Sequence, residues 1–195
     1  AAGVGEEVAE ITEGAMNGDL DFATSLQARV ELLKGLETST FPKILEQIDL
    51  TTGANAFIKE LHRRGYKVGL VSGGFHELID PIAQSLGIDL VQANRLELAD
   101  GRLTGKVLGE IVTPKKKKET LLTWAREYHV EASQTIAIGD GANDLPMIKT
   151  AGIGIAFMAK PIVSRLAPYR IETRDLRHVL EILDKHGKET RCIFY

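Results

Sequence analysis

A short apolar run that stops at a glycine and two carboxylates places the strongest constraint on the fold of this chain. Ile136–Ile138 ends at Gly139, and Asp140 and Asp144 follow about one helical turn apart. A strand that ends in such a turn directs the next side chains to the carboxyl edge of a sheet, where open α/β folds bind their ligands. Two carboxylates at that edge suit a hard cation such as Mg²⁺, which prefers oxygen ligands. The pattern therefore predicts a ligand site at the edge of a parallel sheet.

From residue 51 onward, strand-length apolar runs alternate with amphipathic helical segments. The expected strands are 67–71, 89–93, 136–138, 153–157 and 169–172, with a hairpin formed by 95–98 and 103–107 around Asp100-Gly101. The expected helices are 54–64, 77–86, 116–128, 143–150, 161–166 and 176–186. This alternation predicts an α/β fold with a Rossmann-like parallel sheet and helices on both faces.

The first fifty residues show helical periodicity and no strand pattern. Expected helices cover 6–16, 22–33 and 41–48, with Asp21 as a candidate N-cap of the second. Three amphipathic helices predict a small helical bundle. We therefore expect two domains, a helical one at 1–50 and an α/β core at 51–195.

Length, charge and cysteine content exclude several classes of protein. The 195 residues can bury a core, and the net charge of −3 gives no basic excess for nucleic acid or an anionic membrane. Cys192 is the single cysteine, which excludes an internal disulfide and a cysteine-based zinc cluster. No apolar run has the length of a membrane span, and the N-terminus does not resemble a signal peptide. A cytoplasmic protein fits these features best.

A second turn resembles a phosphate-binding loop. Ser72-Gly73-Gly74 follows the strand at 67–71 and precedes a helix, so its hydroxyl and backbone amides suit a phosphate. An ordinary strand–helix turn also favours serine and glycine, so the motif alone leaves both interpretations open. Because parallel strands end at the same edge of a sheet, Ser72 and Asp140 are expected to face one crevice. Their pairing favours the functional interpretation.

Two further matches, to a dinucleotide fingerprint and to a P-loop, are rejected. Gly139–Asp144 approaches the dinucleotide fingerprint, but its carboxylates would repel a pyrophosphate. Gly101–Lys106 is one residue shorter than a P-loop and fits a hairpin strand better. The run Lys115–Lys118 begins a helix, where a bound anion would offset its charge, although a solvated charged face explains most of the run.

Three features together resemble the phosphoserine phosphatase family of the haloacid dehalogenase superfamily. They are Val71–Phe75, a lysine that opens a helix after a hairpin, and Ile138–Asp144, which contains the specific sequence Gly-Asp-Gly-Ala-Asn-Asp. The resemblance extends over almost the whole chain. It implies that residues 51–195 are the α/β core of that superfamily and that residues 1–50 are its cap.

The resemblance implies Mg²⁺-dependent hydrolysis of O-phosphoserine to serine and phosphate through an aspartyl-phosphate. Asp140 would bind Mg²⁺ with Asp144 in support, and Lys117 would neutralise charge on the phosphoryl group. Charge neutralisation and positioning are what phosphoryl transfer requires. The other implied substrate-binding residues are Ser72, Gly73 and Asn143 in the core, and Arg29, Met16 and Phe22 in the cap, where Arg29 would bind the substrate carboxylate.

The sequence departs from the family at the nucleophile. The family carries it in a D-x-D-x-[TS] motif after the first core strand, which precedes the cap. Asp19-Leu-Asp21 has the D-x-D spacing but continues with Phe-Ala, and Asp49–Thr52 lacks the second acid. We therefore expect the first core strand and the nucleophile to be absent, one position in the sheet to be unfilled, and these 195 residues alone not to turn over.

Two alternatives remain open at this level. One is a non-enzymatic protein that binds phosphorylated ligands or a partner, and a D-x-D-x-[TS] motif encoded upstream of Ala1 would argue against it. The other is a phosphatase of the same superfamily for another small phosphomonoester, which a comparison of substrates would decide. The oligomeric state is also open, with a homodimer as one option.

Overall fold

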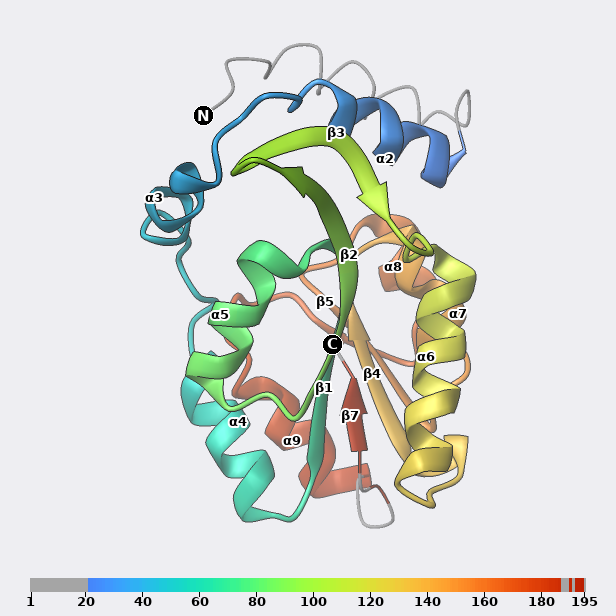
Figure 1. Ribbon diagram of the computed structural model, residues 1–195. Helices are drawn as coiled ribbons and strands as arrows, with labels where there is room; N and C mark the ends of the chain where they lie inside the picture. Colours follow the sequence, from blue (N-terminus) through green and yellow to red (C-terminus); the bar gives the residue numbers. More distant parts are fainter. Residues whose placement is uncertain (1–20, 187–189, 191, 195) are drawn as a thin grey trace. The chain divides into compact units, whose positions relative to one another are not determined.

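The structure is a computed structural model that describes residues 21–186, 190 and 192–194 (Figure 1). The expected helix at 6–16 and the candidate residue Met16 lie outside these residues. The chain forms two compact units. Of the described residues, the first unit contains 21–48, 73–80 and 93–113, and the second contains the rest. The first unit thus includes two segments beyond the predicted domain at 1–50, and the division into 1–50 and 51–195 stays a prediction.

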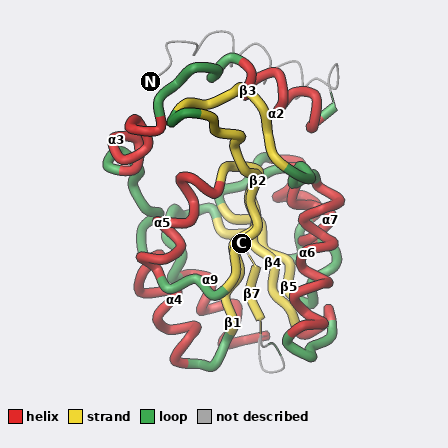
Figure 2. The backbone as a smooth tube through the Cα atoms, in the orientation of Figure 1, coloured by secondary structure: helices red, strands yellow, loops and turns green. Residues whose placement is uncertain are grey.

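A seven-stranded sheet with the order β3-β2-β1-β7-β4-β5-β6 is drawn as yellow strands in Figure 2. Strands β1, β7, β4, β5 and β6 pair in parallel, and β2 pairs antiparallel with β3, so the predicted parallel sheet and hairpin are confirmed. The strands are β1 (Lys67–Phe75), β2 (Leu90–Ala99), β3 (Arg102–Leu108), β4 (Thr135–Gly139), β5 (Ile153–Phe157), β6 (Tyr169–Ile171) and β7 (Cys192–Phe194).

Strand β7 contradicts the expectation that one position in the sheet is unfilled. Ile193 lies in register with Val68 of β1 on one side and with Ile136 of β4 on the other. All three residues of β7 are buried, and burial raises the pKa of the Cys192 thiol. The prediction was wrong because a three-residue apolar segment shows no periodicity in the sequence, yet it pairs with three residues of each neighbouring strand.

Helices cover both faces of the sheet in the second unit (Figure 1). On one face, α4 (Ala54–Arg63) and α9 (His178–His186) pack their apolar side chains against β1, β4, β5 and β7. On the other face lies α6 (Pro114–Glu127), whose Trp124 ring is centred 5.3 Å from that of Phe194. The remaining helices that contain residues of this unit are α5 (His76–Leu86), α7 (Leu145–Ile148) and α8 (Pro161–Leu166).

The first unit is built on the β2–β3 hairpin. Helix α2 (Phe22–Glu31) begins at Asp21, whose carboxylate accepts hydrogen bonds from the amides of residues 23 and 24, as the sequence predicted for an N-cap. Its residues Leu26 and Val30 form a core with Leu96 and Leu103 of the hairpin. Helix α3 (Phe41–Leu45) follows a short 3₁₀ turn. Strands distant in the sequence thus provide the surface on which α2 packs.

No helix in the described part of the chain is long and apolar enough to cross a membrane.

Candidate active site

The turn after β4 brings a carboxylate back onto the strand end. A 3₁₀ helix at Ala142–Asp144 follows Gly139 and Asp140 and leads into α7. A Cβ atom placed on Gly139 would lie 2.6 Å from Cγ of Asp144, so only glycine permits this close approach. The oxygen Oδ2 of Asp144 accepts hydrogen bonds from the amides of Asp140 and Gly141, each 3.1 Å long. Asp144 therefore fixes the backbone of its own turn.

The second oxygen of Asp144 binds a lysine. Nζ of Lys117 donates to Oδ1 of Asp144 at 2.6 Å, and the two side chains are only 8% and 5% exposed. Of the four consecutive lysines at 115–118, Lys117 is the buried one. Its position on α6, which packs beside α7, explains why it reaches the turn. A charge-paired lysine is thereby held at the carboxyl edge of β4.

Asp140 is in a different environment from Asp144. Its side chain is exposed, and among the described residues its carboxylate has no hydrogen-bond or ion-pair partner. The described residues contain no group of three or more histidine, cysteine or acidic side chains close enough together to hold a metal ion. Asp140 is therefore a single carboxylate available to a cation, and Asp144 is already engaged.

The two predicted turns meet at one pocket. A cavity of about 150 Å³ is lined by Ser72 of β1, by Lys117 and by Asp140 and Asp144, together with the apolar residues Leu70, Val71 and Ile138 and with Gly139. The sequence placed Ser72 and Asp140 at one edge of the sheet, and the structure brings them together there. Asn143 lies on the same turn, with its Oδ1 close to Gly141. One hydroxyl, one ammonium group and one exposed carboxylate thus converge on this space.

Gly73 belongs to the first unit, where two side chains fix it. Nδ2 of Asn94 donates to the Gly73 carbonyl at 2.8 Å, while Oδ1 of Asn94 accepts from the amide of Val112 at 2.8 Å. A Cβ placed on Gly73 would lie 3.3 Å from Cζ of Phe22, so the aromatic ring lies close to the glycine backbone. Asn94 is not among the site residues predicted from the sequence. Its partners are 21 and 18 residues away, so no local pattern indicates its role.

Arg29 lies on α2 in the first unit. Its Nε donates to the carbonyl of Ser25 at 3.2 Å, which orients the side chain along its own helix. Within the described residues no carboxylate forms an ion pair with its guanidinium group. An arginine without an ion-pair partner among residues 21–186, 190 and 192–194 suits an anionic group of a ligand.

Replacing Asn94 with leucine is expected to lower the free energy of unfolding by about 1–3 kcal/mol. Asn94 is 1% exposed, so the change leaves the Gly73 carbonyl and the Val112 amide without their partner. Urea unfolding measures the effect. Asn94→Asp keeps the acceptor for Val112 but buries a carboxylate whose second oxygen faces the Gly73 carbonyl oxygen, so it is expected to lower the free energy of unfolding at least as much. A leucine variant as stable as the unmodified protein would contradict this role.

Comparison with known proteins identifies the family. The sequence pattern described as haloacid dehalogenase-like hydrolase matches residues 6–149. The chain belongs to the haloacid dehalogenase-like hydrolase family. The phosphoserine phosphatase of Streptococcus thermophilus is 62% identical over 187 residues, which are 96% of this chain and 87% of that protein. The phosphoserine phosphatase of Methanocaldococcus jannaschii is 47% identical over 182 residues, which are 93% of this chain and 86% of that protein.

Solved structures support the same family assignment. A structure described as a phospho-aspartyl intermediate analogue of phosphoserine phosphatase matches with a TM-score of 0.86 and 48% identity, covering 93% of this chain and 87% of that one. A substrate-bound phosphoserine phosphatase complex matches with a TM-score of 0.87 and 48% identity, covering 93% of this chain and 86% of that one. The predicted hydrolase fold is therefore confirmed.

Proposed function

We propose that the function of this haloacid dehalogenase-like hydrolase is the Mg²⁺-dependent conversion of O-phosphoserine to serine and phosphate, to which these 195 residues contribute the substrate and metal site but not the attacking group. The observation that carries the proposal is the pocket where Ser72, the buried Lys117–Asp144 pair and the exposed Asp140 converge. Two similar proteins are named phosphoserine phosphatase, and one similar structure is described as substrate-bound. Serine biosynthesis is the corresponding physiological role.

Each residue of the pocket has a distinct part in this proposal. The Ser72 hydroxyl donates to a phosphoryl oxygen, and the Lys117 ammonium neutralises charge that develops on the phosphoryl group. Asp144 positions Lys117 and the amides of the turn, so these donors need no rearrangement when the substrate binds. In the first unit, the Gly73 amide and the Arg29 guanidinium are the proposed ligands of the phosphoryl group and of the substrate carboxylate. The roles of Asn143, Met16 and Phe22 stay predictions.

The exposed carboxylate of Asp140 is a suitable ligand for Mg²⁺. Mg²⁺ is usually bound by one or two carboxylates, and waters and substrate phosphate complete its coordination. Asp140 supplies one exposed carboxylate without a partner among the described residues, beside the proposed phosphate position. When bound there, Mg²⁺ would neutralise phosphate charge and polarise the phosphoryl oxygens.

The attacking carboxylate is not assigned to any of these residues. The 195-residue sequence contains no D-x-D-x-[TS] motif. Asp144 has both oxygens engaged, which makes it a poor nucleophile in this arrangement. We therefore propose that the 195-residue chain binds phosphoserine and Mg²⁺ without releasing phosphate. We also propose a cytoplasmic location, since the single cysteine is typical of a reducing compartment.

A comparison of two ligands tests the proposed substrate. O-phosphoethanolamine is O-phosphoserine without its carboxylate, so the difference in their affinities measures carboxylate recognition. We expect calorimetry with Mg²⁺ to show tighter binding of phosphoserine. Arg29→Ala is expected to weaken phosphoserine binding about ten- to hundredfold, as for a lost charged hydrogen bond, and to leave phosphoethanolamine binding unchanged.

The same experiment separates the alternatives. Equal affinity for both ligands in the unmodified protein would contradict a carboxylated substrate and favour a different phosphomonoester. An equal loss for both ligands in Arg29→Ala would contradict the assigned role of Arg29 but not the phosphate pocket. Lys34→Ala, a change of another basic residue in the first unit, serves as the control and is expected to leave both affinities unchanged.

A further inference from the structure

His76 connects the first turn of α5 to strand β2. Its Nε2 lies 3.2 Å from the backbone nitrogen of Ala93, and its Nδ1 lies 2.7 Å from Oδ1 of Asp80. The His76 side chain is only 15% exposed, so the ring is largely shielded from water. These residues belong to the first unit, as does Gly73–Phe75, the end of β1 that directly precedes His76. The ring therefore joins the end of β1 to the next strand of the sheet.

The two contacts determine the tautomer of the His76 ring. A backbone amide can only donate a hydrogen bond, so Nε2 must carry a lone pair to accept from Ala93. In a neutral ring the proton is then on Nδ1, which donates to the Asp80 carboxylate. A protonated ring has an N–H group at both positions and loses the contact with Ala93. The arrangement thus requires a neutral His76.

The charged groups around this ring come from both elements that pack against it. On α5, Asp80 accepts from the ring, and Glu77 accepts from a backbone amide of β2. On β2, guanidinium nitrogens of Arg95 lie 3.8 Å from Glu77 and 3.9 Å from Asp80. The Asp80 carboxylate favours an imidazolium ring, whereas the Ala93 amide requires a neutral one. The protonation state of His76 therefore decides whether its contact with β2 exists.

A second contact joins the same two segments. Nδ2 of Asn94 donates to the Gly73 carbonyl at 2.8 Å, and Asn94 directly follows Ala93 in β2. Consecutive residues of β2 thus hold Gly73 on one side and His76 on the other. We propose that neutral His76 is a positioning residue that holds the Gly73 amide in place for the phosphoryl group, and that protonation of His76 weakens phosphate binding. The phosphate part of this inference rests on the proposed function.

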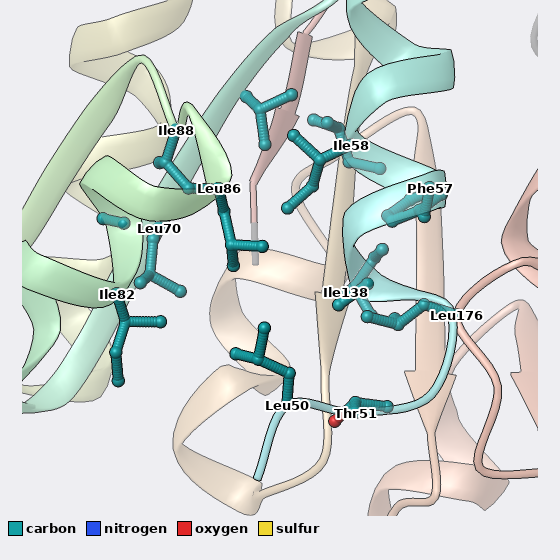
Figure 3. A pocket seen from close by; sticks show the side chains of 14 residues that line it. Leu50, Thr51, Phe57, Ile58, Leu70, Ile82, Leu86, Ile88, Ile138 and Leu176 are labelled. Carbon is teal, nitrogen blue, oxygen red and sulfur yellow. The ribbon is translucent and has the colours of Figure 1, made fainter. Parts of the chain in front are cut away.

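The rest of α5 is anchored independently of His76. From Pro81 onward the helix belongs to the second unit, where Ile82 and Leu86 line an apolar cavity of about 190 Å³. Figure 3 shows both side chains on one side of this cavity, with Phe57 on the other. These apolar contacts do not change with the charge of the ring. We therefore expect substitutions of His76 to alter the end of β1 and to leave the helix folded.

The tautomer gives a test that needs no ligand. Long-range proton–nitrogen NMR spectra distinguish rings protonated at Nδ1, at Nε2 and at both, and the signals lost in His76→Gln identify those of His76. We expect the Nδ1–H form at about pH 8, and we expect the Ala93 amide signal to shift together with the ring as the pH is lowered. An Nε2–H tautomer, or an Ala93 amide that does not respond when His76 titrates, would overturn the proposal.

Two variants connect the ring to phosphate binding, which calorimetry with phosphoserine and Mg²⁺ measures. His76→Leu removes the acceptor and is expected to weaken binding about five- to tenfold at about pH 8. His76→Gln offers an acceptor oxygen that cannot be protonated in this range, and it is expected to bind within about twofold of the unmodified protein. At about pH 5.5 the unmodified protein is expected to bind about fivefold more weakly than His76→Gln. Their ratio cancels the titration of phosphoserine itself.

Two further variants serve as controls. Asp80→Asn keeps an acceptor for Nδ1 but removes the negative charge beside the ring, so the loss of affinity is expected to occur at lower pH. His178 also lies beside a carboxylate, 2.8 Å from Glu181, and no backbone amide of the described residues donates to its ring. His178→Gln is therefore expected to leave the pH dependence unchanged.

The outcomes separate this inference from the proposed function. If the unmodified protein did not bind phosphoserine, the proposed function would fail, and the tautomer and the Ala93 signal would still decide whether neutral His76 holds the end of β1. The same pH dependence in the unmodified protein and in His76→Gln would overturn the role of His76 while phosphoserine binding stands. A leucine variant with a lower thermal midpoint but unchanged affinity would show a purely structural role and also contradict the proposal.

Discussion

Replacing Lys117 with methionine is expected to lower the free energy of unfolding by about 3–5 kcal/mol, because it leaves the buried Asp144 carboxylate without its cation. Nζ of Lys117 lies 2.6 Å from Oδ1 of Asp144, and both side chains are almost fully buried. The same change is expected to abolish phosphoserine binding, since it removes the ammonium group from the pocket. Urea unfolding and calorimetry measure the two effects separately.

Two control variants separate stability from binding. The double variant Lys117→Met/Asp144→Leu removes both charges but also the acceptor of the Asp140 and Gly141 amides, so we expect it to regain only part of the lost stability. It is still expected not to bind phosphoserine. Lys118→Met changes an exposed neighbour on the same helix and is expected to be silent in both measurements. If Lys117→Met bound phosphoserine as well as the unmodified protein does, the assignment of Lys117 would be wrong.

The second large effect concerns the metal. Asp140→Asn is expected to weaken Mg²⁺-dependent phosphoserine binding at least tenfold, because the amide that replaces the carboxylate carries no negative charge for the cation. Stability without Mg²⁺ is expected to be unchanged, since the Asp140 side chain is exposed and has no partner among the described residues. The measurement is a phosphoserine titration with and without Mg²⁺.

Asp49→Asn provides the matched control for the metal experiment. Asp49 is also exposed, so this change removes the same charge away from the pocket. It is expected to leave the Mg²⁺ dependence intact. A Mg²⁺ dependence that survives in Asp140→Asn would show that the cation binds elsewhere.

Local patterns predicted most of the fold. The strands at β4 and β5 were found because each is a continuous apolar run, and buried strands of parallel sheets have this character. The N-cap at Asp21 and the hairpin turn at Asp100-Gly101 followed from local residue preferences, and both turn residues have positive φ. These features are determined within a few residues of sequence.

Features that depend on distant residues were not predictable in this way. The sequence does not show that α2 packs on the β2–β3 hairpin or that Asn94 fixes Gly73, since each contact joins segments far apart in the chain. The three residues of β7 become a strand only because β1 and β4 pair with them. Family resemblance selected Lys117 from four lysines, and its burial beside Asp144 appears only in the folded chain.

Phosphorus NMR of O-phosphoserine mixed with the 195-residue protein and Mg²⁺ tests the central claim most directly, because it observes binding and hydrolysis in one sample. We expect the phosphoserine resonance to shift or broaden with the unmodified protein but not with Lys117→Met, and no resonance of inorganic phosphate to grow with time. A phosphoserine resonance unaffected by the unmodified protein would contradict the proposed site. Growth of inorganic phosphate would show that these residues already contain the attacking group.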